Sequence, residues 1–373
     1  MRLTRLASAF FSLCSLLCAC GVGAERAPTP QRGNAAPDAN ARQGEAKPEA
    51  QQEKKPRAAV DPNKFAIVIA GVGGEEAYTK KFSAEASRLY DALTTRLGFD
   101  EKNVSLLVEN INGGPENGAR DTERPTARRA TADEARKAFA SIKTAASADS
   151  LVLVALVGHG SFDAQQAKFN LVGPDLTAND YAQLVGALPT RRVVFVNCAS
   201  SSGEFLKPLS GESRVVITAT RSGNEQNATT FAEHFIGALT DEGADADKNG
   251  RVSVLEAFSY ASKLTADWYK QKNRLATEHA MIDDNGDGVG HEEATGGDGA
   301  FAKTLYLDSK PLGQAGGDAE LVRLMGERQR LEEAVEKLKA RKAGMKQEDY
   351  DNELEGLLVE LAKVNQAIKA RQK

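Results

Sequence analysis

Two side chains of this sequence are suited to covalent chemistry, the thiol of Cys198 and the imidazole of His159. Three of the four cysteines lie within the first twenty residues, which leaves Cys198 alone in the rest of the chain. Each residue follows an apolar run, 151–157 before His159 and 192–197 before Cys198. A thiolate is a strong nucleophile, and a nearby imidazole lowers the thiol pKa and can protonate a leaving amine. The pair is therefore predicted to be a catalytic dyad.

The glycine after the histidine indicates how such a dyad would stabilise a reaction intermediate. The backbone N–H groups of Gly160 and Cys198 are predicted to form an oxyanion hole, because glycine lets the backbone approach a carbonyl oxygen closely. Taken singly, each residue also has a plain structural reading: a cysteine at a strand end is often buried, and a lone histidine is often a hydrogen-bonded polar group. Catalysis is predicted from their combination at two strand ends, where reactive groups of parallel sheets collect.

A second group of residues has the spacing of a calcium site. Residues 245–256 fit the twelve-residue EF-hand loop, with oxygen ligands at positions 1, 3 and 5, glycine at 6 and glutamate at 12. The predicted ligands are Asp245, Asp247, Asn249, the backbone carbonyl of Arg251, and Glu256. Helices predicted at 231–239 and 254–275 flank the loop. An acidic turn without a metal is the alternative.

A weaker copy of this pattern follows. Its predicted ligands are Asp283, Asn285 and Asp287. Position 12 is Ala294, so that Glu292 or Glu293 would have to close the site by a different path of the loop. Runs of Asp, Asn and Gly also form ordinary surface turns, which is the alternative for this segment.

The elements that must position these groups follow from hydrophobic periodicity. Apolar runs predict strands at 65–70, 104–108, 151–157, 192–197 and 214–219, and helical patterns lie between them at 82–97, 132–142 and 181–188. The domain is expected to close with residues 300–307. Alternation of strands and helices predicts an α/β domain over residues 63–310, with a mainly parallel sheet covered by helices on both faces. Leucines at 3/4 spacing predict a helical hairpin or coiled coil over residues 318–373.

The N-terminus is typical of an exported protein. Arg2 and Arg5 precede an apolar stretch, 6–17, that is too short to span a bilayer. The residues up to Cys20 resemble the lipobox of bacterial lipoproteins, which implies a signal peptide at 1–19, lipidation of Cys20 and an outer-membrane location in the cell envelope. An ordinary cleaved signal is the alternative. Residues 20–62 are predicted to be a disordered tether, since they lack apolar periodicity.

The two strand ends together resemble the caspase–haemoglobinase clan of cysteine peptidases, and within it bacterial members of the legumain family. The likeness spans residues 63 to about 308 and includes the segment 218–231 behind the nucleophile. It implies a caspase-haemoglobinase-like fold, a Cys198–His159 dyad and a peptide substrate. Residues 199–201 depart from the Glu-Ser-Gly of plant and animal legumains, so the resemblance does not carry asparagine specificity over. Asn197 is not the acidic residue that arginine-specific relatives place before the nucleophile, so arginine specificity is not supported either. Arg221 and Glu225 are the expected pocket residues.

The predicted function is that of a calcium-stabilised cysteine endopeptidase without an organic cofactor. A net charge of −4 and the absence of a basic block argue against nucleic-acid binding. Two alternatives use the same residues: a transpeptidase or ligase, or a calcium-binding scaffold lipoprotein with an inactive peptidase fold. Residues 318–373 would mediate homo-oligomerisation or act as an inhibitory cap.

Overall fold

A computed structural model describes residues 58–110, 127–247, 250–295, 297–309 and 319–371. The predicted signal peptide, Cys20 and most of the tether lie outside the described residues. No helix in the described ranges is both long enough and apolar enough to cross a membrane.

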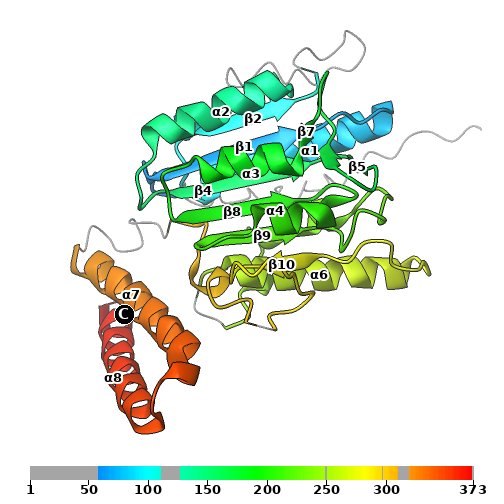
Figure 1. The fold of residues 1–373 in the computed structure, drawn as a ribbon. Coiled ribbons are helices and arrows are strands. Elements are labelled where there is room, and N and C mark those ends of the chain that lie inside the picture. The colour runs from blue at the N-terminus through cyan, green and yellow to red at the C-terminus, as the bar shows by residue number, and fades with distance from the viewer. Residues whose placement is uncertain (1–57, 111–126, 248–249, 296, 310–318, 372–373) are drawn as a thin grey trace, which may run out of the picture. The chain divides into compact units, whose positions relative to one another are not determined.

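A seven-stranded sheet forms the centre of the fold (Figure 1). Its strands are β1 (Lys64–Ala70), β2 (Val104–Val108), β3 (Ala127–Arg129), β4 (Leu151–Val157), β8 (Arg192–Asn197), β9 (Arg214–Thr218) and β10 (Met281–Asp283). Their order is β10-β9-β8-β4-β1-β2-β3, and all pairs are parallel except β10 with β9. The mainly parallel sheet that the apolar runs predicted is confirmed.

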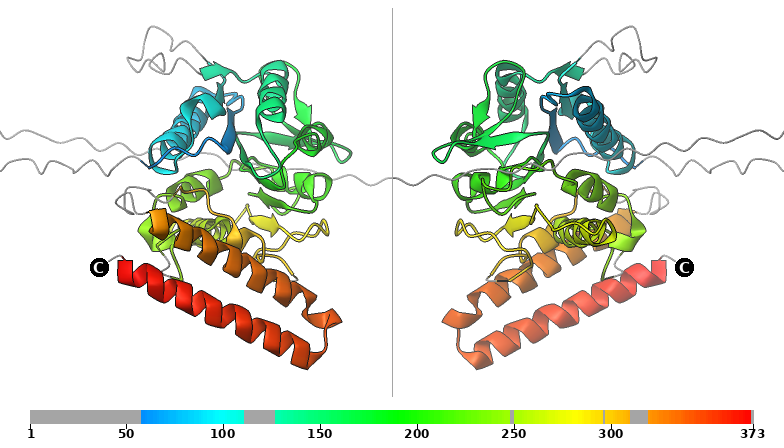
Figure 2. Two further views of the ribbon diagram at one scale, coloured as in Figure 1. Left: turned by 90° about the vertical axis from the view of Figure 1, so that its left-hand side faces the viewer. Right: turned by 90° about the vertical axis from the view of Figure 1, so that its right-hand side faces the viewer.

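Helices cover both faces of this sheet. One apolar cluster joins it to α1 (Glu76–Asp91), α5 (Phe231–Ala238) and α6 (Val254–Gln271), and another joins it to α2 (Ala132–Ala145), α3 (Ala178–Gly186) and α4 (Leu206–Leu209). The side views place α1 (blue) and α2 (teal) on opposite sides of the sheet (Figure 2). Each face is apolar because side chains alternate along a strand: Leu153 and Ala155 of β4 belong to the first cluster, and Val152 and Val154 to the second.

Shorter elements complete the described part of the fold. A small antiparallel sheet of β5 (Gly160–Phe162), β6 (Ala167–Phe169) and β7 (Leu176–Thr177) follows β4. The short helices are η1 (Ala92–Arg96), η2 (Glu101–Asn103), η4 (Ser202–Phe205), η5 (Glu242–Ala244), η6 (Ala302–Thr304) and η7 (Lys342–Gly344). Helix α6 ends at Gln271, short of the predicted Leu275, and Asn273 there adopts a positive φ of 50° that ends helical geometry.

The segment predicted to close the domain does so through a buried lysine. The Nζ of Lys64, at the start of β1, donates hydrogen bonds to the carbonyl of Leu307 at 2.9 Å and to that of Leu97 at 3.2 Å. Burial lowers the pKa of Lys64 to about 8. The ammonium is thus held by backbone carbonyls, which compensate part of the cost of removing it from water.

The C-terminal helices form an antiparallel pair with apolar contacts of its own. Helix α7 (Ala319–Arg341) and helix α8 (Gln347–Arg371) are joined by η7. Leu321, Leu324 and Ile368 form a separate buried cluster between them. The predicted helical hairpin is therefore confirmed.

Candidate active site and metal-binding loops

The two strands that carry the predicted dyad are neighbours in the sheet. Strand β4 pairs with β8 in parallel, with Leu156 opposite Asn197, so His159 and Cys198 lie at the same edge. Odd-numbered residues of β4 and even-numbered residues of β8 face α1, α5 and α6, and the cluster on this side also includes Cys198. The topology thus brings both predicted residues to the carboxyl ends of adjacent central strands.

The thiol itself is enclosed. Cys198 is only 3% exposed and packs in the apolar cluster between the sheet and its first layer of helices. Burial, with a smaller effect of the Glu85 and Glu278 carboxylates, raises the pKa of the Cys198 thiol. The backbone carbonyl of Cys198 accepts a hydrogen bond from the Thr229 hydroxyl. In this conformation the sulfur is therefore a protonated thiol shielded from solvent.

The imidazole of His159 is half-buried against α1. Its ring makes edge contacts with Tyr78 and Phe82, at 4.8 and 4.9 Å between ring centroids. Burial, with a contribution from Lys81, lowers the pKa of His159, so that the neutral form predominates near pH 7. Among the described residues, no hydrogen bond or ion pair joins the imidazole to the Cys198 thiol. The fold brings the two residues to one edge, but the conformation does not couple them.

Both N–H groups predicted for the oxyanion hole have protein partners. The N–H of Cys198 donates to the Leu156 carbonyl at 2.8 Å, and the N–H of Gly160 donates to the Ser200 hydroxyl at 3.2 Å. A side chain at position 160 would collide with the Ser200 carbonyl oxygen, which explains the glycine. In this conformation neither group is free to receive a substrate oxygen.

The thiol of Cys198 has buried carboxylates near it, which hydrophobic periodicity did not indicate. Glu85 of α1 is 5% exposed, and its carboxylate lies 3.8 Å from the Lys81 ammonium. Burial raises the pKa of Glu85 to about 7. Lys81 also donates to the Thr229 carbonyl at 2.9 Å. Glutamate and lysine within an amphipathic helix usually face solvent. The sequence pattern therefore predicted the apolar face of α1 but not the burial of Glu85.

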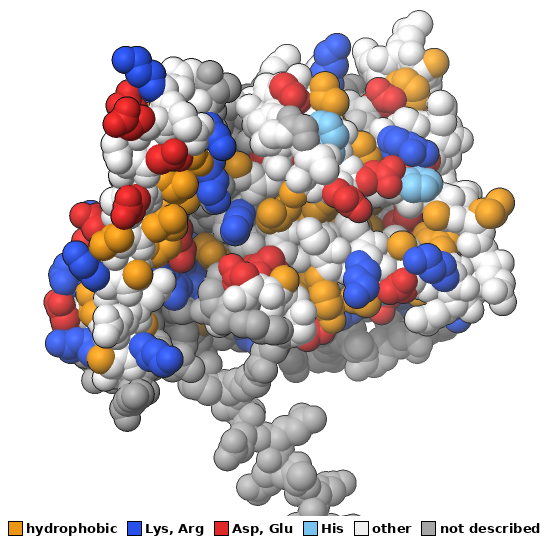
Figure 3. Space-filling model, turned by 90° about the horizontal axis from the view of Figure 1, so that it is seen from below, with side chains coloured by type: hydrophobic (Ala, Val, Ile, Leu, Met, Phe, Trp, Pro, Cys, Tyr) orange, Lys and Arg blue, Asp and Glu red, His pale blue; other side chains and the backbone are white. Residues whose placement is uncertain are grey.

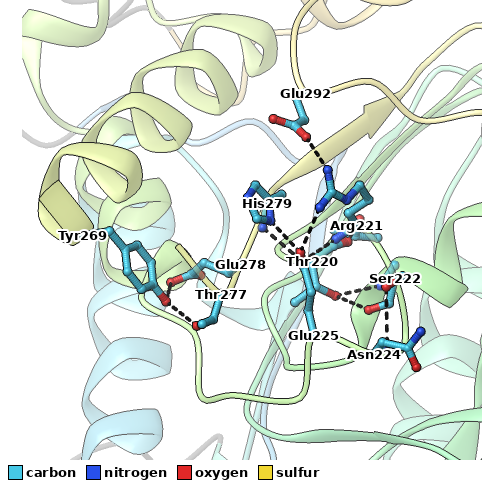
Figure 4. A network of polar contacts seen from close by, with 12 residues as sticks. Thr220, Arg221, Ser222, Asn224, Glu225, Tyr269, Thr277, Glu278, His279 and Glu292 are labelled. Atoms are coloured by element: carbon cyan, nitrogen blue, oxygen red, sulfur yellow. Dashed lines mark hydrogen bonds and ion pairs between the residues drawn. The ribbon is translucent and has the colours of Figure 1, made fainter. Parts of the chain in front are cut away.

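A second buried carboxylate, Glu278, organises the start of α5. It accepts hydrogen bonds from the N–H and O–H of Thr230 at 2.8 Å each and from the N–H of Phe231 at 3.1 Å. The Tyr269 hydroxyl donates to it at 3.1 Å (Figure 4). This carboxylate satisfies N–H groups at the helix start that lack partners within the helix.

The two predicted pocket residues lie in one polar network. The Glu225 carboxylate accepts from the Arg221 N–H at 2.8 Å and contacts the His279 ring nitrogen at 2.5 Å, and Arg221 also pairs with Glu292 at 3.3 Å (Figure 4). The Glu225 carbonyl accepts from the N–H of Ser201, three residues after the thiol. The network is therefore attached to the loop behind Cys198, and the Glu225 carboxylate is engaged by protein groups.

The first predicted calcium loop brings its acidic residues together. One carboxylate oxygen from each of Asp245, Asp247 and Glu256 lies within 4.8 Å of the others, so that the three could hold a metal ion. Gly250 has a φ of +81°, the backbone conformation for which the pattern requires glycine. Asn249 lies outside the described residues. The Arg251 side chain points elsewhere: it forms an ion pair with Asp308 at 2.7 Å.

Glu256 links this loop to the helix after it. Its carboxylate accepts hydrogen bonds from the N–H groups of Ala246 and Asp247 in the loop, at 3.0 and 3.2 Å. It also accepts from Ser253 at the start of α6, forming a capping box. Glu256, the twelfth residue of the pattern, thus both closes the loop and caps the start of the helix.

The second loop is closed by a residue that the sequence did not indicate. Asp298 is buried and accepts from the N–H groups of Asp284 and Asn285, the second and third positions, as Glu256 does in the first loop. The two glutamates expected to close it lie elsewhere, since Glu292 pairs with Arg221 and Glu293 lines a separate cavity.

Two of the three predicted oxygen ligands of this loop are in contact, since the Asn285 amide donates to Asp287 at 3.2 Å. The third, Asp283, accepts from the Gly288 N–H at 3.1 Å. Asp298 stands sixteen positions into the pattern instead of twelve, so the twelve-residue template could not identify it.

No family model matches this chain, and no curated protein matches it. Among solved structures, the fold is similar to the crystal structure of protein GSU0716 from Geobacter sulfurreducens, with 12% sequence identity and a TM-score of 0.38. The alignment covers 60% of this chain and 93% of that chain. A likeness of this degree says nothing about activity, which has to be inferred from the site itself.

Proposed function

We propose that the protein is a cysteine endopeptidase similar to bacterial legumain-family enzymes, with Cys198 as nucleophile and His159 as proton donor and acceptor. The observation that carries this proposal is the placement of the two residues at the carboxyl ends of adjacent parallel strands, β4 and β8, on the face covered by α1. A histidine and a lone thiol that meet at this edge have the residue types of a nucleophile and its acid–base partner.

The proposed reaction balances within the dyad and one water molecule. The Cys198 sulfur bonds to the peptide carbonyl carbon, the carbon–nitrogen bond breaks, and His159 delivers the thiol proton to the leaving amine. Water then hydrolyses the thioester, which releases the acid and restores the thiol. A second amine that replaces this water would give ligation instead of hydrolysis.

The described conformation corresponds to a resting form in this proposal. The thiol is buried and protonated, and both N–H groups of the expected oxyanion hole are engaged. Reaction requires that the loop after Cys198 moves, exposing the sulfur and freeing the N–H of Gly160 from Ser200. Such a rearrangement separates hydrogen bonds worth about 1 kcal/mol each, a cost that substrate binding can offset.

Calcium is the proposed ligand of the loop at 245–256. Carboxylate oxygens are hard ligands of the kind Ca²⁺ prefers, and the loop supplies three of them within 4.8 Å. The loop at 283–298, with Asp283, Asp287 and the closing Asp298, is a second candidate. In both loops a carboxylate closes onto N–H groups of the second and third positions.

Substitution of the nucleophile tests the peptidase proposal. Cys198→Ala should abolish cleavage of a peptide library followed by mass spectrometry, while circular dichroism shows an unchanged fold. Ser161→Ala, on the exposed side of β5, is the matched control and should retain activity. Undiminished cleavage by the Cys198→Ala protein would refute the dyad. The ratio of ligated to hydrolysed product with added amines separates a ligase from a peptidase.

Burial of the thiol favours a second candidate function, a calcium-binding scaffold in the cell envelope with an inactive peptidase fold. The raised pKa of the Cys198 thiol and the lack of a hydrogen bond between this thiol and His159 are what a cysteine without a catalytic role would show. Alkylation by iodoacetamide near pH 7, with and without calcium, distinguishes the two. A folded protein that is neither labelled nor active under any of these conditions is the scaffold.

Attachment to the outer membrane through Cys20 is also part of the proposal. The lipobox-like residues before Cys20 support it, and several acyl chains on one residue would anchor the protein stably. Incorporation of radiolabelled palmitate into the wild-type protein, and its loss in Cys20→Ala, is the expected result. A wild-type protein that carries no label would contradict lipidation.

A further inference from the structure

Helix α8 carries two rows of side chains along its length. The members of each row are separated alternately by four and three residues, the spacing that keeps side chains on one face of a helix. The first row packs against α7, where Ile368 joins Leu321 and Leu324 in a buried cluster, and Tyr350 at its other end is also buried. This row consists of Tyr350, Leu354, Leu357, Leu361, Val364 and Ile368. The hairpin is therefore held together by this face of α8.

The second row of α8 is exposed along its whole length. Its members are Asp351, Glu355, Leu358, Ala362, Asn365 and Lys369. At its centre, Leu358 is 47% exposed and the adjacent Val359 is 45% exposed, and both line a shallow, mainly apolar hollow on α8. In the view from below, hydrophobic side chains of the hairpin (orange, at the left) lie between acidic and basic ones (Figure 3). The row thus has an exposed apolar centre between charged ends.

The second row is complementary to itself when it is read in the opposite direction. Its members form three pairs, each placed at equal distances from residue 360: Asp351 and Lys369, Glu355 and Asn365, and Leu358 and Ala362. Two antiparallel copies of α8, related by a two-fold axis at the level of residue 360, would bring the members of each pair together. Opposite charges then meet at both ends, an amide meets a carboxylate, and apolar side chains meet at the centre.

Other arrangements and partners fit this row less well. Two parallel α8 helices would place Asp351 beside Asp351 and Lys369 beside Lys369 of the second molecule, and like charges at an interface repel each other. The first turn of α8 is acidic and the last turn is basic, so a partner of uniform charge would be repelled by one half of the helix. An anionic lipid surface, for example, would attract Lys369 but repel Asp351 and Glu355.

We infer that the protein associates with a second copy of itself through this exposed row, with the two α8 helices packed antiparallel. Each hairpin contributes two helices, so four helices meet in the dimer, and the apolar centre of the row becomes buried as in a helix bundle. The contacts involve neither Cys198 nor His159, so dimerisation is independent of the proposed peptidase function.

The exposed position of the charged groups limits the strength of this dimer. Charge pairs at a surface contribute little affinity and mainly determine register and orientation. The Asp351 carboxylate also accepts a hydrogen bond from the Gln347 side chain at 2.8 Å, an exposed contact that pairing with Lys369 would share or replace. Because the apolar centre is small, the dimer is expected to be weak and to form at micromolar concentrations.

Sedimentation of the whole chain tests this association. In the parent protein for these tests, Cys20→Ala prevents acyl chains from contributing, and a monomer–dimer equilibrium is expected between about 1 and about 500 µM, the range of weak dimers. Leu358→Glu should weaken the dimer at least about tenfold, because it places an unpaired charge at the apolar centre. An unchanged circular dichroism spectrum would show that α8 remains helical in this variant.

A residue outside the hairpin supplies the matched control. Val60 is 46% exposed, nearly as much as Leu358, and Val60→Glu should leave the association unchanged. A parent protein that is monomeric over the whole concentration range would overturn the inference. So would a Leu358→Glu protein that dimerises as the parent does.

Exchange of the terminal charges tests the antiparallel register. Asp351→Lys should weaken the dimer about twofold to fivefold at low salt, because two lysines then meet, and Lys369→Asp should weaken it similarly. The two changes together restore opposite charges and should return the affinity to that of the parent. Single variants without effect, or a double variant as weak as either one, would contradict antiparallel packing.

Vesicles test a lipid surface as the competing occupant of this face. The parent and its Leu358→Glu variant are mixed with phosphatidylglycerol vesicles, and both should co-sediment to the same extent. If Leu358→Glu lowers binding to the vesicles while the parent stays monomeric in solution, the row binds lipid and the dimer is refuted.

Discussion

The Cys198 thiol and the Glu85 carboxyl share a buried environment, and burial favours the uncharged form of both. The pKa of Glu85 is raised to about 7, so this carboxyl changes charge within the physiological range. When it ionises, a negative charge near the sulfur makes a thiolate still less favourable. Reactivity of Cys198 and protonation of Glu85 are therefore expected to be coupled.

Replacement of Glu85 by glutamine should remove a pH dependence of stability. The folded state keeps the proton up to about pH 7, whereas the unfolded state loses it near the ordinary glutamate pKa of 4.5, so the free energy of unfolding falls as pH rises between these values. The loss amounts to about 3 kcal/mol for Glu85 alone. In Glu85→Gln this loss should be absent, as measured by urea unfolding at pH 5 and pH 8.

The matched control for this experiment lies on the same helix. Glu76 begins α1, is exposed and pairs with Lys80, so Glu76→Gln should leave the difference between pH 5 and pH 8 nearly as in the wild-type protein. A Glu85→Gln protein with the wild-type pH dependence would show that the carboxyl is not buried in solution.

At the scale of elements, the sequence predicted those strands that have a strong hydrophobic pattern. The central strands β1, β2, β4 and β8 are continuous apolar runs, because they are buried on both faces, and their positions were predicted to within one residue. Strands β3, β5, β6, β7 and β10 were not predicted. Each has only two or three residues, too few for a periodic pattern, and tertiary pairing determines its structure.

The same difference applies to the candidate sites. Motif spacing indicated His159, Cys198 and the first acidic loop, because those residues follow strands or a fixed local template. Spacing could not indicate Glu278 or Asp298, whose roles depend on contacts with distant segments. The burial that makes the Cys198 thiol unreactive in this conformation also has no local signature in the sequence.

Calcium should stabilise the protein through the loop that begins α6. At a concentration of calcium one hundred times the dissociation constant, the free energy of unfolding rises by about 2.7 kcal/mol. Glu256→Gln should remove most of this gain, because glutamine can keep the capping box but not the ligand charge. Thermal unfolding with calcium and with a chelator measures the difference.

An exposed acid farther along α6 supplies the comparison. Asp267→Asn removes one negative charge from the same helix without touching the loop, and it should leave the calcium effect intact. Equal stabilisation of the Glu256→Gln and wild-type proteins by calcium would show that the ion binds elsewhere.

At the scale of the whole molecule, the described chain contains separate apolar clusters. Two lie on the faces of the sheet, and the third lies between α7 and α8. Each cluster buries side chains mainly from its own elements. Stability of the α/β domain is therefore expected to depend little on the helical hairpin.

Removal of residues 318–373 tests this independence. The shortened protein should unfold within about 3 °C of the wild-type transition, since the sheet clusters remain complete. Calorimetry measures the transition, and peptide cleavage measured on the same sample tests the inhibitory cap. A cap requires faster cleavage after removal, and an unchanged rate leaves homo-oligomerisation as the role of the hairpin.

The two outer strands of the large sheet have a consequence for behaviour at high concentration. β3 and β10 are three residues long, and β3 carries the exposed Arg128 and Arg129. A sheet edge can recruit a strand from another molecule only where enough backbone N–H and C=O groups lie unpaired in a row. Short, charged edge strands of this kind oppose the addition of strands from other molecules. The central strands are apolar enough to form fibrils if the protein unfolds, but they stay buried while it is folded.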